Sequence, residues 1–241
     1  MNRYVAIALL AVLGTLAGCV NADDNNPKDG HKDANSDPSS YGTTHTVNGA
    51  IRVRAGEKKD DLSTVNGSIH IEDNAVVAGA ETVNGAISLG MHATAESAHT
   101  VNGAITLGDG ARITRTISAV NGTLTLQSGA DTAGAATNVN GKIVLQAAHV
   151  GGGINTVNGD IDVGANSHVE GGIVVQKEHD TFWFLHWGTS TTPRIVIGPG
   201  AVVQGNLRFE RQVQLYVSEQ ASIGPVSGAT AVKFSGASPP K

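Results

Sequence analysis

Apolar residues in the central part of the chain recur with alternating gaps of two and four positions. After Val101, the apolar positions are Ile105, Leu107, Ala111, Ile113 and Ile117. A gap of two indicates a β-strand, because alternate side chains of a strand face the same side. A gap of four indicates a corner, where the chain turns without burying a side chain. Each copy of this pattern therefore predicts three short strands joined by three corners.

The same pattern returns with a fixed period. The tripeptide Val-Asn-Gly begins at positions 47, 65, 83, 101, 120, 139 and 157, so the steps between successive copies are nearly constant. Regular repeats of this kind are typical of solenoids, in which each repeat stacks on its neighbours. The sequence predicts an all-β fold, a triangular parallel β-helix of about nine coils of 18–19 residues within residues 45–224.

The corner residues have structural interpretations. In this prediction Asn-Gly supplies the positive backbone dihedrals of a tight corner. Stacked in register, the asparagine amides form a ladder of side-chain hydrogen bonds. The threonines that precede most of the valines are expected to form a second, outward-facing ladder. The predicted ladder asparagines are Asn48, Asn66, Asn84, Asn102, Asn121, Asn140 and Asn158.

An antiparallel meander is the alternative fold, because Asn-Gly between strands is also a strong hairpin signal. A meander does not require a constant period, whereas a stack of coils does. The seven evenly spaced copies therefore favour the solenoid.

The apolar rhythm is interrupted once, by an insertion at residues 177–193, and resumes at Ile195. Its aromatic residues have two interpretations. They cover an apolar face of the solenoid, or they contact a glycan, a lipid headgroup or a partner protein, for which tryptophan is well suited. These aromatic residues are Phe182, Trp183, Phe184 and Trp187. Residues 225–241 are expected to form a C-terminal tail or a cap over the last coil.

The N-terminal residues predict export. A charged start followed by a short apolar run in residues 1–18 is typical of a secretory signal peptide. Leu16-Ala17-Gly18-Cys19 resembles the lipobox of bacterial lipoproteins, and Cys19 is the only cysteine. The resemblance implies cleavage before Cys19, acylation of that residue and anchoring to a membrane. The alternative is an ordinary signal peptide that contains a cysteine.

The residues after the lipobox refine this picture. Val20 follows the cysteine, which favours the outer membrane. Residues 19–44 are polar, with almost no apolar side chains to bury, and predict a disordered tether between the membrane and the solenoid.

Two family resemblances cover most of the repeats. The pattern Thr-Val-Asn-Gly-x-Ile-x-Leu, over residues 45–163, resembles the adhesin-like family of bacterial β-strand repeats. Residues 193–207 are similar to the repeats of bactofilins, which implies a triangular β-helix that polymerises end to end. Neither resemblance implies a catalytic residue.

Composition and candidate chemistry predict a protein that is not an enzyme. A formal net charge of −5 and sparse basic residues argue against nucleic-acid binding. Asp160 and Asp162 are a weak match to the carboxylate clusters of β-helix polysaccharide lyases. Residues 197–202 suit a coil of hexapeptide-repeat acyltransferases, but no carboxylate partner is predicted for any histidine. His179 and His186 lack a third ligand at suitable spacing, so no metal site and no cofactor are predicted.

The sequence therefore predicts a lipid-anchored protein of the cell envelope with a scaffold or surface-interaction role. A homo-polymer, an envelope protein or a glycan is the expected partner, beside the membrane that holds the anchor. The alternatives are a glycan- or partner-binding module that acts through the aromatic insertion and, more remotely, a β-helix enzyme of the lyase or acyltransferase type.

Overall fold

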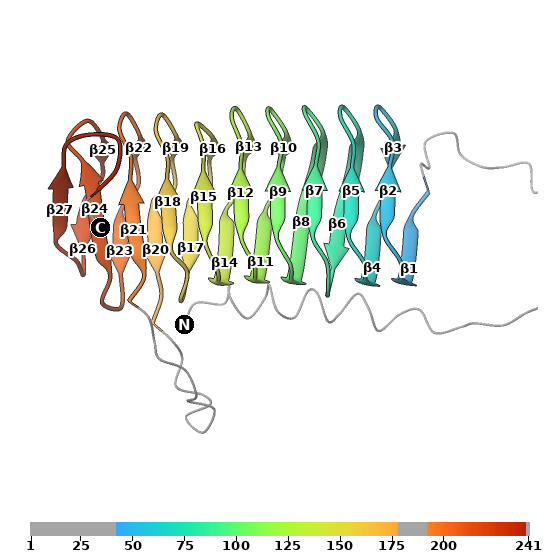
Figure 1. The fold of residues 1–241 in the computed structure, drawn as a ribbon, viewed down its shortest axis with the longest axis horizontal. Helices are drawn as coiled ribbons and strands as arrows, with labels where there is room; N and C mark the ends of the chain where they lie inside the picture. The colour runs from blue at the N-terminus through green and yellow to red at the C-terminus, as the bar shows by residue number, and fades with distance from the viewer. Residues whose placement is uncertain (1–41, 178–191, 240–241) are drawn as a thin grey trace, which may run out of the picture.

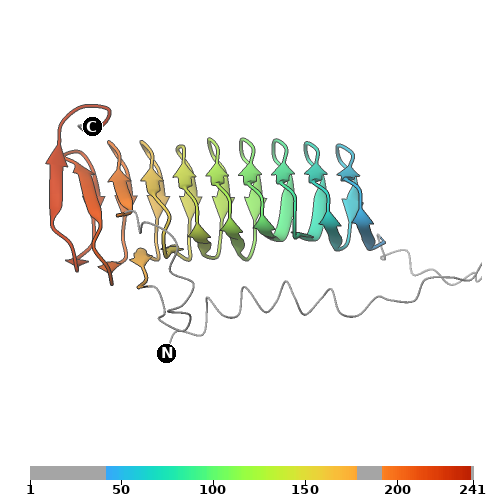
Figure 2. The ribbon, with the colours of Figure 1, turned by 60° about the horizontal axis from the view of Figure 1, so that its bottom comes forward.

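The protein is a parallel β-helix of about ten rungs stacked in a single row (Figures 1 and 2). The computed structural model describes residues 42–177 and 192–239. Every strand pairing in this part is parallel, and each of the first nine rungs contributes strands to three faces, the last rung to two. The predicted all-β solenoid is confirmed, with one rung more than the nine expected. Within the described residues, no helix is long and apolar enough to cross a bilayer.

The first face is a separate sheet of ten strands. Its strands are β2 (Ile51–Val53), β5 (Ile69–Ile71), β7 (Ile87–Leu89), β9 (Ile105–Leu107), β12 (Leu124–Leu126), β15 (Ile143–Leu145), β18 (Ile161–Val163), β21 (Arg194–Ile197), β24 (Gln214–Ser218) and β27 (Ala231–Phe234). The order along the stack is the order along the chain.

The second and third faces form one sheet of seventeen strands, because β6 (Val76–Thr82) and β8 (Thr94–Asn102) run through the corner between them. The second face also contains β3 (Lys58–Lys59), β10 (Arg112–Ile113), β13 (Asp131–Thr132), β16 (His149–Val150), β19 (His168–Val169), β22 (Val202–Val203) and β25 (Ser222–Ile223). The third also contains β1 (Thr44–Asn48), β4 (Leu62–Asn66), β11 (Ile117–Asn121), β14 (Ala136–Asn140), β17 (Ile154–Thr156), β20 (Ile173–Val175), β23 (Leu207–Phe209) and β26 (Val226–Ser227).

The register places equivalent residues of successive repeats directly over one another. Ile87 pairs with Ile105, and Ile105 with Leu124. Ile161 pairs with Ile195 although the whole insertion lies between them, so the insertion leaves the pairing of the stack intact. Side chains that share a repeat position therefore line up in columns along each face.

The interior is a narrow aliphatic core of isoleucine, leucine, valine and alanine. Ile69, Ile105 and Leu124 on the first face are fully buried. Burying each such side chain favours folding by about 1.5–3 kcal/mol. The core is continuous from the first rung to the last, so the rungs stabilise one another.

The side chains around the Val-Asn-Gly unit face the opposite way from the prediction. The threonine before the valine faces inward. Thr64, Thr82 and Thr100 are only 1–2% exposed. Their hydroxyl groups donate hydrogen bonds to the carbonyl oxygens of Gly49, Gly67 and Gly85 on the preceding rung. The valine lies on the outer side, and Val47 is 62% exposed. A small hydroxyl is tolerated in the core here because the corner carbonyl satisfies it.

Most corner glycines have a different role from the one predicted. Of the seven, Gly49 and Gly141 have a positive φ, at 152° and 159°, close to extended backbone, whereas Gly67, Gly85 and Gly103 have none. A Cβ on Gly103 would lie 1.9 Å from the carbonyl oxygen of Gly85, so glycine is needed for the close approach of two rungs. Positive φ occurs instead at the corner between the first and second faces, for example at Asn74 and His92.

The predicted tail or cap of residues 225–241 is largely a further rung. β26 pairs with β23, and β27 pairs with β24. Phe234 is 5% exposed. Strand pairing satisfies the backbone groups along the edge of the preceding rung, so the stack continues up to Phe234 instead of ending near residue 224.

Candidate functional site: a histidine–carboxylate cluster on the second face

The predicted functional residues fall into two groups. Cys19 and the aromatic residues Phe182, Trp183, Phe184 and Trp187 lie outside the described residues, as do the predicted signal peptide and most of the predicted tether. The seven corner asparagines all lie within the described part.

The structure brings the seven asparagines together in one column on the third face. Each Nδ2 from Asn66 onward donates to the Oδ1 of the asparagine one rung earlier, at 2.9–3.0 Å. All amides therefore point the same way along the stack, and their dipoles add. Such a ladder holds rungs in register and offers no acid, base or nucleophile.

The C-terminal end of the asparagine ladder meets a cation. Arg211 Nη1 donates to Asn158 Oδ1 and to the carbonyl oxygen of Val157, the latter at 3.2 Å. The last amide oxygen is the negative end of the aligned dipoles, so a guanidinium is a favourable partner there. Lys177, the last described residue before the insertion, follows β20, in which Val175 pairs with Thr156, two residues before Asn158.

The second face carries a different column, in which the side chains are ionisable. Arg112, Asp131, His149 and His168 lie on four successive rungs, in β10, β13, β16 and β19. Arg112 Nε is 3.3 Å from Asp131 Oδ2, and Asp131 Oδ1 is 2.5 Å from His149 Nδ1. The rings of His149 and His168 stack with their centroids 5.6 Å apart and an interplanar angle of 28°.

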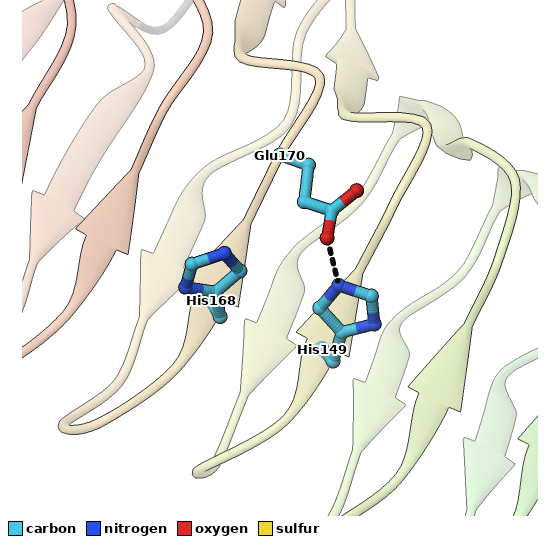
Figure 3. Close-up of side chains that lie close together, drawn as sticks. All are labelled: His149, His168 and Glu170. Atoms are coloured by element: carbon cyan, nitrogen blue, oxygen red, sulfur yellow. Dashed lines mark hydrogen bonds and ion pairs between the residues drawn. The ribbon is translucent and has the colours of Figure 1, made fainter.

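Glu170, the residue directly after β19, also contacts this column of side chains. Its Oε1 lies 3.2 Å from His149 Nε2, and Figure 3 shows its carboxylate reaching back to the His149 ring. Gly151 is the equivalent residue one rung earlier, so the preceding rung has no side chain at this position. Potential ligand atoms of His149, His168 and Glu170 all lie within 4.8 Å of one another. These three residues are named the His–Glu cluster below.

The surroundings of His149 in the His–Glu cluster favour the positively charged form of its ring. The hydrogen bond with Asp131 raises the pKa of His149 above its ordinary value of 6.5, Glu170 adds to the rise, and partial burial opposes it. With a carboxylate at each ring nitrogen, the imidazolium form donates at both. Asp131 fixes one nitrogen and leaves Nε2 directed toward Glu170.

Sequence reasoning missed the His–Glu cluster, because it treated the histidines as scattered. The steps from Asp131 to His149 and from His149 to His168 each equal one period of the repeat. An alignment of the copies by their apolar positions places the three residues in one column. The two aspartates singled out from the sequence lie elsewhere: Asp162 accepts from Lys142 Nζ at 3.2 Å, and Asp160 Oδ1 accepts from the backbone N–H of Arg194 at 2.8 Å.

No family model, no curated protein and no solved structure matches this chain.

Proposed function

We propose that the chain is a non-enzymatic, lipid-anchored β-solenoid of the cell envelope with a scaffold or surface-interaction, adhesin-like role. The observation that carries this proposal is the use of the repeat residues. The recurring asparagine bonds to the next asparagine, and the recurring glycine allows two rungs to approach. The threonine hydroxyls bond to corner carbonyl groups. The residues of the repeat thus serve to hold neighbouring rungs together, which supports a structural role.

The stack has the dimensions of a short rod. Ten rungs are separated by nine steps of about 4.8 Å, which gives roughly 43 Å between the first and the last. Three flat faces run along this length, and each is a regular surface for an envelope protein, a glycan or a second copy of the chain.

The anchor is the lipobox cysteine. Acyl chains on Cys19 would each contribute about 0.8 kcal/mol per buried methylene, so that two or more chains hold a protein at a bilayer. The polar residues between Cys19 and β1 would then separate the rod from the membrane. Val20 favours delivery to the outer membrane.

A second candidate function is the binding of a glycan or a partner protein through the insertion at residues 177–193. Its position favours this candidate. The pairing of β18 with β21 and of β20 with β23 continues past the insertion, so a binding loop there does not disturb the stack.

The proposal is tested by expressing the full chain with its own signal in a Gram-negative host that is fed an alkyne analogue of palmitate. We expect the wild type to incorporate the label and to fractionate with the outer membrane. The Cys19→Ser variant is the matched control and should carry no label. A wild type that is exported without lipid would contradict the anchored function, whatever the fold.

The alternative is tested by replacing Trp183 and Trp187 with alanine. Binding to a glycan array or to envelope extracts that is lost in this variant, with an unchanged melting temperature, would favour the binding module. Equal binding by both proteins would favour the scaffold.

A further inference from the structure

We propose that His149, His168 and Glu170 form a binding site for a divalent transition metal ion of the Zn²⁺ class on the second face of the stack. This inference stands apart from the lipid anchor and rests on side chains within the described residues. Two imidazoles and one carboxylate are a ligand set that suits Zn²⁺, Cu²⁺ or Ni²⁺ better than Mg²⁺ or Ca²⁺, which prefer oxygen ligands.

The distances are close to those of a metal centre. Nitrogen and oxygen ligands lie about 2.0–2.2 Å from zinc, so two ligands of a tetrahedral site are roughly 3.3–3.5 Å apart. His149 Nε2 and Glu170 Oε1 already have nearly that separation, at 3.2 Å. The candidate ligand atoms of all three residues lie within 4.8 Å of one another, so a small side-chain rotation brings the third ligand into place.

Asp131 provides the support that a metal-binding histidine needs. Its carboxylate holds the Nδ1 of His149 at 2.5 Å, which leaves the lone pair of Nε2 for a metal once the Nε2 proton is displaced. Arg112 holds the other oxygen of Asp131 at 3.3 Å. The ligand is thus oriented by a chain of side chains from the two preceding rungs, and the backbone register fixes their spacing.

His168 presents a lone pair to a neighbouring donor. Its Nε2 is 3.0 Å from the Nε2 of Gln204, and a hydrogen bond between these atoms requires the glutamine to donate and the imidazole to accept. The atom that accepts from Gln204 is the atom that would bind the metal. Gln204 is therefore a competitor for His168, not a ligand.

The local charge also suits a dication. Asp131 and Glu170 bring two negative charges, and Arg112 is paired with Asp131. In the imidazolium form, the proton on His149 Nε2 lies between the ring and Glu170, and a metal ion would take its position. Glu170 is exposed and the histidines are half-buried, so the fourth coordination position faces solvent and is open to water or to a ligand from a partner.

The site is tested by isothermal titration calorimetry of ZnCl₂ into the purified, chelator-treated full-length protein. We expect one ion bound per chain through this cluster. His149→Gln and His168→Gln should each weaken the affinity by about tenfold or more, and Asp131→Asn by about 10–100-fold. Gln204→Ala should bind at least as tightly as the wild type.

The matched control is His70→Gln, because His70 is also an outward histidine that bonds to a neighbouring rung, through Ser88, but on the first face. It should leave the affinity unchanged. Circular dichroism checks that each variant is folded. The proposal is overturned if the wild type binds no Zn²⁺, or if folded His149→Gln and His168→Gln bind it as the wild type does. Substitution with Co²⁺ gives an independent readout: intense visible bands, lost in His168→Gln, indicate a tetrahedral site with histidine ligands.

Discussion

The seven Val-Asn-Gly rungs and the last three rungs build the same stack from different residues. The first group has a continuous asparagine ladder and a nearly constant repeat. The last three rungs have no Val-Asn-Gly, and the steps along the first face, from Ile161 to Ile195 to Leu215 to Ala231, are unequal. Their backbone pairing is nevertheless just as regular. The difference shows that parallel pairing and inward apolar residues define the fold, whereas the asparagine ladder is an addition to it.

The last three rungs hold their surface together with other contacts. The Arg194 guanidinium lies 5.0 Å from the centroid of the Tyr216 ring, and Arg208 Nη2 is 2.7 Å from Glu210 Oε1. Phe209 and Phe234 replace smaller side chains in the core. The last three rungs thus differ from one another both in the size of their core residues and in the length of their corners, as expected of rungs that are not identical copies.

The largest effect on stability is expected from replacing the corner glycine of a laddered rung, that is, one of the seven Val-Asn-Gly rungs that carry the asparagine ladder. Gly103→Ala would place a Cβ 1.9 Å from the carbonyl oxygen of Gly85 and force two rungs apart. We expect a loss of about 3 kcal/mol or more in the free energy of unfolding, measured by urea denaturation. Gly56→Asn is the control: a Cβ at Gly56 meets no atom within 4 Å, and asparagine adopts the same positive φ at Asn74. Equal losses of unfolding free energy in both variants would contradict the idea that glycine is needed at position 103 because two rungs approach closely there.

Core truncation should affect the two regions alike. Ile105 in a laddered rung and Leu215 in a later rung are both buried on the first face. Ile105→Ala and Leu215→Ala are each expected to lower the free energy of unfolding by about 2–5 kcal/mol. Urea denaturation measures both losses. A much smaller loss for Leu215→Ala would mean that the last rungs are not part of one cooperative stack.

The ladder itself should contribute less than the core. Asn102 lies in the middle of it and takes part in two amide hydrogen bonds, with Asn84 and Asn121. Asn102→Ala is expected to lower the free energy of unfolding by about 1–3 kcal/mol in the same assay. Asn48 ends the ladder and takes part in one such bond, with Asn66, so Asn48→Ala should cost about half as much. Identical losses at the two positions would argue against a ladder in which each bond adds stability.

The smallest expected effect is a pH dependence that belongs to the laddered rungs, because the chain has no histidine after His186. Burial lowers the pKa of His99 below its ordinary value of 6.5, and Ser118 Oγ lies 2.6 Å from its Nδ1. The unfolded chain then binds more protons at this residue than the folded chain, so stability falls as pH decreases below about 6.5. His149, whose pKa is raised, contributes in the opposite direction in both proteins, so the signed change is compared. The urea midpoint at pH 5.5 minus that at pH 7.5 should be more positive in His99→Asn than in the wild type, and a more negative value in the variant would reverse the assigned sign.

Much of the fold could be predicted from the sequence, because the period and the gaps of two and four are imposed directly by the geometry of a three-sided coil. The orientation of Thr64 and Val65 could not, since alternation gives the spacing of inward residues but not which residue of a corner begins the next strand. The tenth rung was missed because the short step from Leu215 to Ala231 departs from the repeat. The His–Glu cluster was missed because His149 meets His168 and Glu170 only across two rungs, so the copies must be aligned position by position before the three residues come together.

The central claim, that both regions belong to one continuous stack, is tested most directly by a distance between spin labels. Ser88 and Val232 lie on outward positions of β7 and β27, and seven rung-to-rung pairings connect them through β9, β12, β15, β18, β21 and β24. Labels at Ser88→Cys and Val232→Cys, in a Cys19→Ser background, are expected to give one narrow distance distribution centred at about 34 Å. A broad distribution, or a mean below about 20 Å, would show that the last rungs do not continue the stack.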